Sequence, residues 1–125
     1  MQRIAMTVML KDKPGIIEEY DRIHADPYPV VLEKGHQAGI RRLFIYRLRR
    51  QLFMFIETDD GFDIETSMAE ALTDPEFMEW ETLAWELQAA VPGEPEDTRW
   101  VPMTELRHIL CIARRDTQRS GYNVM

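Results

Sequence analysis

Apolar and polar residues alternate along residues 3–11, "RIAMTVMLK", which is the pattern of a β-strand with one buried face. Two further segments, 41–48 and 51–57, are rich in β-branched and aromatic residues and predict a pair of strands joined by a short connection. A last strand is predicted at 98–110, "TRWVPMTELRHIL". The chain is therefore expected to contain four strands.

Helical periodicity occupies the segments between these strands. Residues 12–24, "DKPGIIEEYDRIH", carry apolar or aromatic side chains three and four positions apart and a proline suited to a first turn. A short helix is predicted over 29–38, ending at Gly39. Two more are predicted over 62–72 and 75–91, the second with Thr73 or Asp74 as its cap.

The element order β-α-β-β-α-β predicts an α+β fold of the ferredoxin-like type, a four-stranded antiparallel sheet with helices on one face. With 125 residues, the chain can build one sizeable core but not two. Residues 1–110 are expected to form this single domain. The C-terminal tail, 111–125, has no clear period, and its role is left open.

Both faces of the central strands are apolar. The side chains expected on one face are Leu43, Ile45, Leu52, Met54 and Ile56. Those expected on the opposite face are Phe44, Tyr46, Phe53 and Phe55. Helices can cover only one face, so a second copy of the same sheet is the simplest cover for the other. We expect a homodimer with its sheets face to face, a dimeric α+β barrel.

Composition and charge exclude several classes of protein. The single cysteine, Cys111, rules out an internal disulfide and a cysteine-based zinc cluster. The sequence shows no signal peptide and no membrane span, so a cytoplasmic protein without a membrane partner is expected. Five arginines lie within 41–50, whereas 51–98 holds 14 of the 22 acidic residues and no Lys or Arg. With a net charge of −7, these arginines are expected to pair with carboxylates and not with nucleic acid.

Candidate chemistry is concentrated in residues 18–29, "EEYDRIHADPYP". Tyr20 and His24 are four positions apart and share one face of the predicted helix, which must kink at Pro27 and Pro29. His24 is the best acid–base candidate, because imidazole titrates closest to neutral pH. A Tyr–His pair on an apolar helix face is more often part of the core, with its polar atoms hydrogen-bonded, than part of a functional site. Both interpretations stay open on spacing alone.

Other motifs add little chemistry. Trp80 has an aromatic face suited to a sugar ring, although its helical spacing with Phe77 and Ala84 is more typical of a core. Asp21 and His24 have half the spacing of a helical metal site, and no second pair completes it, so no metal is expected. Phosphate-binding loops and nucleophile motifs are absent from the sequence, so no cofactor is expected.

The stretch 18–29 resembles the L-rhamnose mutarotase family, whose members interconvert the α and β anomers of 6-deoxy-L-hexoses and include enzymes acting on L-fucose. The matching residues are Glu19, Tyr20, His24, Tyr28 and Pro29. The resemblance continues through "LFMFIE", "LTDPEFMEW" and "AAVPGEPED" to "ELRHI", and it covers residues 3–109. Known members are dimeric ferredoxin-like barrels, which agrees with the two-faced sheet.

The resemblance implies that Tyr20 and Trp80 contact the substrate and that His24, also at the substrate, is the proton donor. Three departures matter, and the first is that Ala25-Asp26 follows His24 where the family usually has Asn-Pro. The family's site tyrosine on the second strand is here Leu43, and the first of its paired tryptophans is Glu79. The chemistry is expected to be kept with a different preferred sugar, and whether Leu43 and Glu79 alter or abolish the activity is left open.

The expected function is that of an isomerase, a mutarotase for L-rhamnose or L-fucose in carbohydrate catabolism, working by acid–base ring opening without metal or cofactor. The group that assists His24 is left open between Tyr20, Glu79 and a held water. Two other classes also stay open: a cofactor-free monooxygenase or isomerase of the dimeric α+β-barrel type, and a non-catalytic small-ligand-binding dimer. The arginines leave a sugar acid as a further possible ligand.

Overall fold

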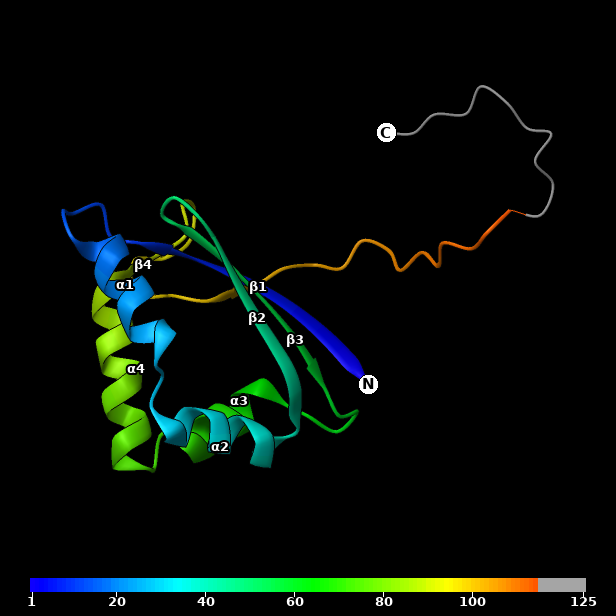
Figure 1. Cartoon of the computed structure of the whole chain (residues 1–125), viewed down its shortest axis with the longest axis horizontal. Coiled ribbons are helices and arrows are strands. Elements are labelled where there is room, and N and C mark those ends of the chain that lie inside the picture. Colours follow the sequence, from blue (N-terminus) through cyan, green and yellow to red (C-terminus); the bar gives the residue numbers. More distant parts are fainter. Residues whose placement is uncertain (115–125) are drawn as a thin grey trace, which may run out of the picture.

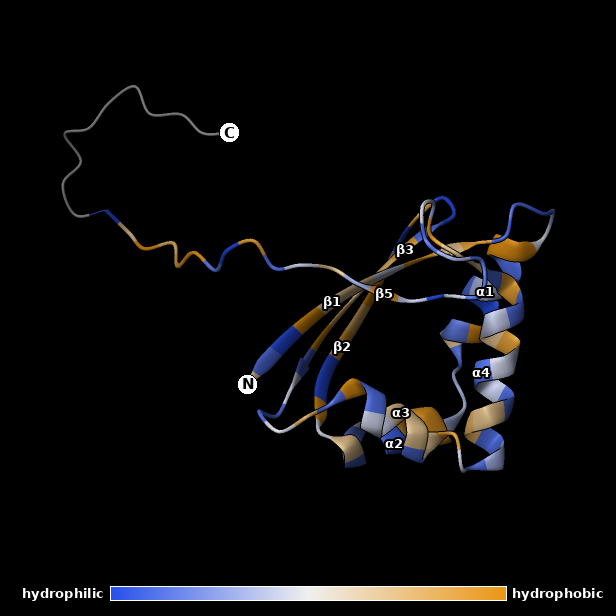
Figure 2. Cartoon of the chain, turned by 180° about the vertical axis from the view of Figure 1, so that it is seen from behind, coloured by the Kyte–Doolittle hydropathy of each residue, from blue (hydrophilic) through white to orange (hydrophobic). Residues whose placement is uncertain are grey.

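The structure, a computed structural model, describes residues 1–114, in which pairs of helices separate the strands (Figure 1). In chain order the elements are β1 (Gln2–Leu10), α1 (Ile16–Ala25), α2 (Pro29–Ala38), β2 (Ile40–Leu48), β3 (Gln51–Thr58), α3 (Ile64–Ala71), α4 (Pro75–Leu87), β4 (Gln88–Ala89) and β5 (Val101–Pro102). Figure 2 shows α1 and α4 standing together on one side of the strands, with α2 and α3 beside each other at one end.

The sheet is antiparallel throughout, with strand order β2-β3-β1-β4, and β5 also pairs with β1. Val8 lies opposite Leu52, and Met54 lies between Met6 on β1 and Ile45 on β2, so these side chains share one face of the sheet. This topology and the helix positions confirm the predicted ferredoxin-like α+β fold.

The predicted strand at 98–110 is wrong over most of its length. Only Val101 and Pro102 pair with β1, and the rest of 103–114 is neither helix nor strand. The alternating apolar side chains that suggested a strand point into solvent, as Leu106 does at 93% exposure. Within the described residues, this segment finds no further strand edge with which to pair, and alternation alone does not make a strand. The predicted tail at 111–125 lies mostly outside the described residues.

Helix α4 also ends earlier than predicted, at Leu87 instead of Val91. Gln88 and Ala89 leave the helix because they pair with Leu10 and Met9 of β1. The edge of β1 that faces away from β3 is thus shared by two short strands, β4 near its end and β5 near its middle. Together they take the place of the fourth strand.

Of two buried clusters, one packs a helix on the sheet and the other packs helices on one another. The first contains Val8, Leu10, Tyr20 and Leu52, and joins α1 to β1 and β3. The second contains Val30, Ala71 and Phe77, and joins α2, α3 and α4, with Tyr28 packed against it. Each fully buried aliphatic side chain contributes on the order of 1.5–3 kcal/mol. The kink between α1 and α2 lies between these clusters. The first cluster holds the helix before the kink, and the second holds the helix after it.

Two parts of the sheet surface are left open in this chain. On the outer face, the Phe44 and Phe55 rings lie 6.3 Å apart and the Tyr46 and Phe53 rings 6.2 Å apart, and Tyr46 is 61% exposed. On the helix-facing side of β2, Leu43 and Ile45 are 48% and 37% exposed although their partners across the sheet, Ile56 and Met54, are buried or half-buried. The helices therefore cover the middle of β2 less completely than β1 and β3.

Helix α4 begins where the sequence predicts, with Asp74 as its cap. The Asp74 carboxylate accepts hydrogen bonds from the backbone N–H groups of Glu76 (2.9 Å) and Phe77 (3.3 Å). We expect Asp74→Ala to lower the free energy of unfolding by about 1 kcal/mol, the usual loss for an N-cap, as measured by chemical denaturation. Asp74→Ser, which keeps a capping oxygen, is the matched control; equal losses in the two variants would contradict a capping role.

Candidate active site

Helix α1 brings Tyr20 and His24 together as the sequence predicts. Their rings are stacked, with centroids 4.1 Å apart and planes 23° from parallel. Tyr20 is buried at 3% exposure, whereas His24 is half-buried. The helix ends at Ala25, directly before the proline pair, so the imidazole lies in the last helical turn beside the kink.

Tyr20 is part of the core and is also tied to the start of β4. Its hydroxyl accepts a hydrogen bond from the Gln88 side-chain amide at 3.1 Å. Burial raises the pKa of Tyr20 to about 12, against the opposing effect of the Gln88 hydrogen bond. The phenol is therefore uncharged at neutral pH. It supports the imidazole through ring contact and is unsuited to act as a base.

The protonation state of His24 follows from its hydrogen bond. Nδ1 lies 2.9 Å from the backbone carbonyl oxygen of Tyr20. A carbonyl can only accept, so Nδ1 carries the hydrogen and the neutral ring keeps its lone pair on Nε2. Burial lowers the pKa of His24, while the Tyr20 carbonyl and the charge of Asp21 oppose that change. At neutral pH the imidazole is thus a proton acceptor through Nε2, and it becomes a donor after it has taken up a proton.

Trp80 lies between two other aromatic rings. The His24 ring meets it edge-on at 5.1 Å between centroids, and the Tyr28 ring packs at 5.2 Å. Trp80 is only 5% exposed, because these rings and the α4 packing cover it. The structure therefore brings all three predicted site residues together, as a cluster in which Tyr20 and Trp80 flank His24. Direct sugar contact by Tyr20 and Trp80 stays a prediction.

A polar pair that the sequence did not predict adjoins this aromatic cluster. The Tyr28 hydroxyl donates to Glu79 Oε1 at 3.1 Å. This bond to the protonated phenol raises the pKa of Tyr28. Tyr28 lies among the residues that match the family, and Glu79 is one of the departures, but nothing in the sequence shows that they meet. The exposed carboxylate supplies hydrogen-bond acceptors next to Trp80.

The strand arginines pair with carboxylates, as expected from the charge distribution. Arg41 binds Asp59 and Arg42 contacts Glu57, both in the acidic segment. Arg47 instead makes two hydrogen bonds to Asp21 on α1, Nε to Oδ1 at 2.9 Å and Nη2 to Oδ2 at 2.7 Å. This contact joins the edge strand to the helix that carries His24, and no pattern in the sequence predicts it.

Two surface cavities lie away from His24. The larger, about 290 Å³, is lined by Lys11, Gln88, Ala89, Ala90, Glu96 and Arg99. The smaller lies between α2 and α3. His24 lines neither cavity, so a substrate pocket beside it is a hypothesis. Among residues 1–114, no cluster of three His, Cys, Asp or Glu side chains is placed to hold a metal ion. None of the helices there is long and apolar enough to cross a membrane.

The fold and the neutral histidine define a small α+β protein equipped for acid–base chemistry. The family model described as L-rhamnose mutarotase matches residues 3–109, and the chain belongs to this family, which implies an isomerase-type enzyme. An L-fucose mutarotase of Xanthomonas campestris pv. campestris is 32% identical over 102 residues, 80% of this chain and 82% of that protein. A UPF0734 protein of Dictyostelium discoideum is 32% identical over 104 residues, 79% of this chain and 82% of that protein.

Solved structures show the same fold at lower identity. An L-rhamnose mutarotase from Formosa agariphila superimposes with a TM-score of 0.64 at 15% identity, covering 87% of this chain and 99% of the other. Tetracenomycin F2 cyclase from Streptomyces glaucescens, a type-II polyketide cyclase, superimposes with a TM-score of 0.58 at 20% identity, again over 87% and 99%. Both similarities establish the fold alone, because proteins with this fold carry out different reactions.

Proposed function

We propose that this protein is a mutarotase that interconverts the α and β anomers of a 6-deoxy-L-hexose, L-fucose or L-rhamnose. The observation that carries the proposal is a neutral His24 with a free Nε2, at a position that matches the family. The named activity of the Xanthomonas relative supports the substrate class. The proposal assigns the protein to carbohydrate catabolism in the cytoplasm, and the single cysteine, Cys111, fits a reducing compartment.

The proposed mechanism needs one shuttled proton. His24 Nε2 takes the proton of the anomeric hydroxyl as the bond between C1 and the ring oxygen breaks. The protonated imidazole then donates this proton to the ring oxygen. Both oxygens are attached to C1, so one imidazole can reach them in turn. Rotation about the C1–C2 bond exposes the other carbonyl face, and closure reverses the transfers. Tyr20 is disfavoured as the assisting base, which leaves Glu79 acting through Tyr28, or a water molecule.

A site that includes β2 would suit a 6-deoxy sugar. We propose that Leu43 and Ile45, exposed on the helix-facing side of β2, supply apolar surface for the methyl group. The Glu79 carboxylate then accepts a hydrogen bond from a sugar hydroxyl. Tyr20 and Trp80 act mainly by holding the His24 ring, because so little of their own surface is exposed.

Anomer exchange measured by saturation-transfer NMR tests the proposal. We expect the protein to accelerate exchange of L-fucose or L-rhamnose well above the spontaneous rate, and to accelerate D-glucose, which carries a hydroxyl at C6, much less. The faster of the two deoxy sugars identifies the preferred substrate. Binding of either sugar without faster exchange would contradict the proposal and favour a non-catalytic ligand-binding protein.

We propose that the outer face of the sheet forms a homodimer. Phe53→Glu would bury an unpaired carboxylate in that interface at a cost of several kcal/mol, so the dimer should dissociate at least roughly a hundredfold more readily. Light scattering after size-exclusion chromatography measures this. Leu32→Glu, at a 64% exposed position on α2, is the matched control and should stay dimeric. A monomeric wild type, or a dimeric Phe53→Glu variant, would contradict this interface.

A further inference from the structure

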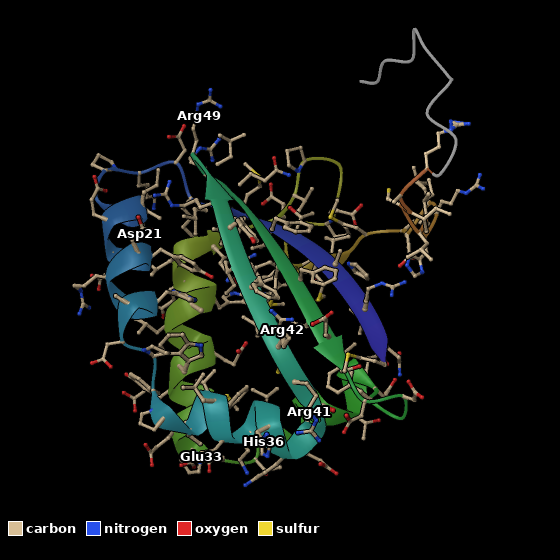
Figure 3. The ribbon with its side chains drawn as sticks, turned by 45° about the vertical axis from the view of Figure 1, so that its right-hand side comes forward. Asp21, Glu33, His36, Arg41, Arg42 and Arg49 are labelled. Carbon is tan, nitrogen blue, oxygen red and sulfur yellow. The ribbon has the colours of Figure 1, made fainter. Side chains whose placement is uncertain are left out.

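The ion pair between Arg47 and Asp21 stands one helical turn before His24. Arg47 is 30% exposed and also donates from Nη1 to the carbonyl oxygen of Arg49 at 3.1 Å, in the hairpin turn where Arg49 has a φ of 53°. Its guanidinium is thus held from two sides, by the hairpin and by α1. Figure 3 shows Asp21 on α1 and Arg49 at the tip of the β2–β3 hairpin.

Asp21 and His24 are three positions apart on one helix, so their Cβ atoms are roughly 5–6 Å apart on the same side. The carboxylate favours a protonated imidazole, and the guanidinium bound to it opposes that effect. We propose that Arg47 is a positioning residue for His24: by pairing with Asp21 it fixes the net charge beside the imidazole and so sets how readily Nε2 takes up a proton. This inference rests on the acid–base function proposed for His24.

Other charged groups near His24 are placed differently. On α1 they are Glu18, which acts on Arg47 through space, and Glu19, which pairs with Arg22. On α4 they are Glu79, bonded to Tyr28, and Glu81, a half-buried carboxyl near Tyr20 whose pKa burial raises. These groups are the same in every variant considered below. A change in His24 titration can therefore be assigned to the Arg47–Asp21 pair.

Two single substitutions break the same ion pair but leave opposite charges. In Arg47→Gln the Asp21 carboxylate is uncompensated, so the titration midpoint of His24 should move to higher pH. In Asp21→Asn the Arg47 guanidinium is uncompensated, so the midpoint should move to lower pH. The double variant restores a net charge of zero and should titrate near the wild type. A purely structural contact would give the two single variants changes in the same direction.

The measurement is an NMR titration of the histidine ring signals, with the His24 signals assigned from their loss in His24→Gln. Each single variant should shift the midpoint by a few tenths of a pH unit, the order expected for one partly solvated charge at this separation. The titration needs no sugar and no turnover. Its outcome is therefore separate from the success or failure of the proposed mutarotase activity.

The pair between Arg41 and Asp59 provides the matched control. It has the same two-point geometry, at 3.0 and 2.6 Å, but lies at the opposite end of β2, beside His36 (Figure 3). Arg41→Gln should perturb the His36 signals and leave the His24 midpoint unchanged. Opposite shifts in Arg47→Gln and Asp21→Asn, with no shift in Arg41→Gln, support the proposal. Shifts in the same direction, or no shift in either variant, would overturn it.

Discussion

Replacing His24 with glutamine is expected to remove nearly all catalysed anomer exchange while leaving the fold intact. The glutamine amide can replace the ring N–H that donates to the Tyr20 carbonyl, so the local hydrogen bond is kept. An amide does not take up a proton near neutral pH, so the proton transfer is lost. The rate constant for exchange should fall by about 10²–10⁴-fold, the usual contribution of a positioned acid or base.

The control for this prediction is a second histidine. His36 is exposed in the last turn of α2 and contacts Arg41, whereas Tyr28 of the aromatic cluster caps the other end of that helix. His36→Gln should keep the wild-type exchange rate and unfold within about 0.5 kcal/mol of the wild type, as surface substitutions usually do. His24→Gln, which alters a half-buried ring stacked on Tyr20, should remain folded. Full exchange activity in a folded His24→Gln variant would contradict the assignment of His24 as the residue that transfers the proton.

The pH dependence of the wild type follows from the same geometry. Only the neutral imidazole has a free Nε2, so exchange should be fastest above the pKa of His24 and decline below it. Burial lowers this pKa from its ordinary value of 6.5. The activity should therefore be level through neutral pH and fall on the acid side, where the ring holds its proton. A decline with rising pH through neutrality would instead indicate that the protonated ring is the active form.

Local patterns in the sequence predicted most of the fold. Alternation located β1, and β-branched and aromatic content located β2 and β3, to within about one residue of their observed bounds. Pro29 marked the start of α2 and Gly39 its end. Each of these signals depends only on residues within or next to one element, so it can be recognised from the sequence alone.

The failures concern contacts between elements. The fourth strand position is shared by β4 and β5 because both pair with β1. The sequence patterns at the end of α4 and at 98–110 do not show which of these residues will pair with that edge of β1. In the candidate site, too, contacts within one element were predicted and contacts between elements were not. Helical spacing predicted the Tyr20–His24 stack, whereas Tyr28 and Glu79 are 51 positions apart and meet only because α2 packs on α4.

Replacing Trp80 with alanine is expected to have the largest effect on stability. The indole is 5% exposed and contacts the rings of His24 and Tyr28, so its loss leaves a cavity where α4 meets α1 and the kink. We expect the free energy of unfolding to fall by about 3–5 kcal/mol, as for other buried aromatic residues. Trp85→Ala is the matched control on the same helix. Trp85 is 44% exposed and its ring lies against the Arg99 guanidinium, so Trp85→Ala should lower the free energy of unfolding much less.

Kinetics of the milder Trp80→Phe variant decide what the ring does in the reaction. If Trp80 holds His24 in place, the variant loses kcat with little change in KM, because the imidazole no longer meets the anomeric hydroxyl at the right angle. If the indole is the surface on which the sugar stacks, KM rises instead, because substrate and transition state lose the same contact. The burial of Trp80 beneath His24 and Tyr28 favours the first result, and a rise in KM alone would show that these rings move aside when a sugar binds.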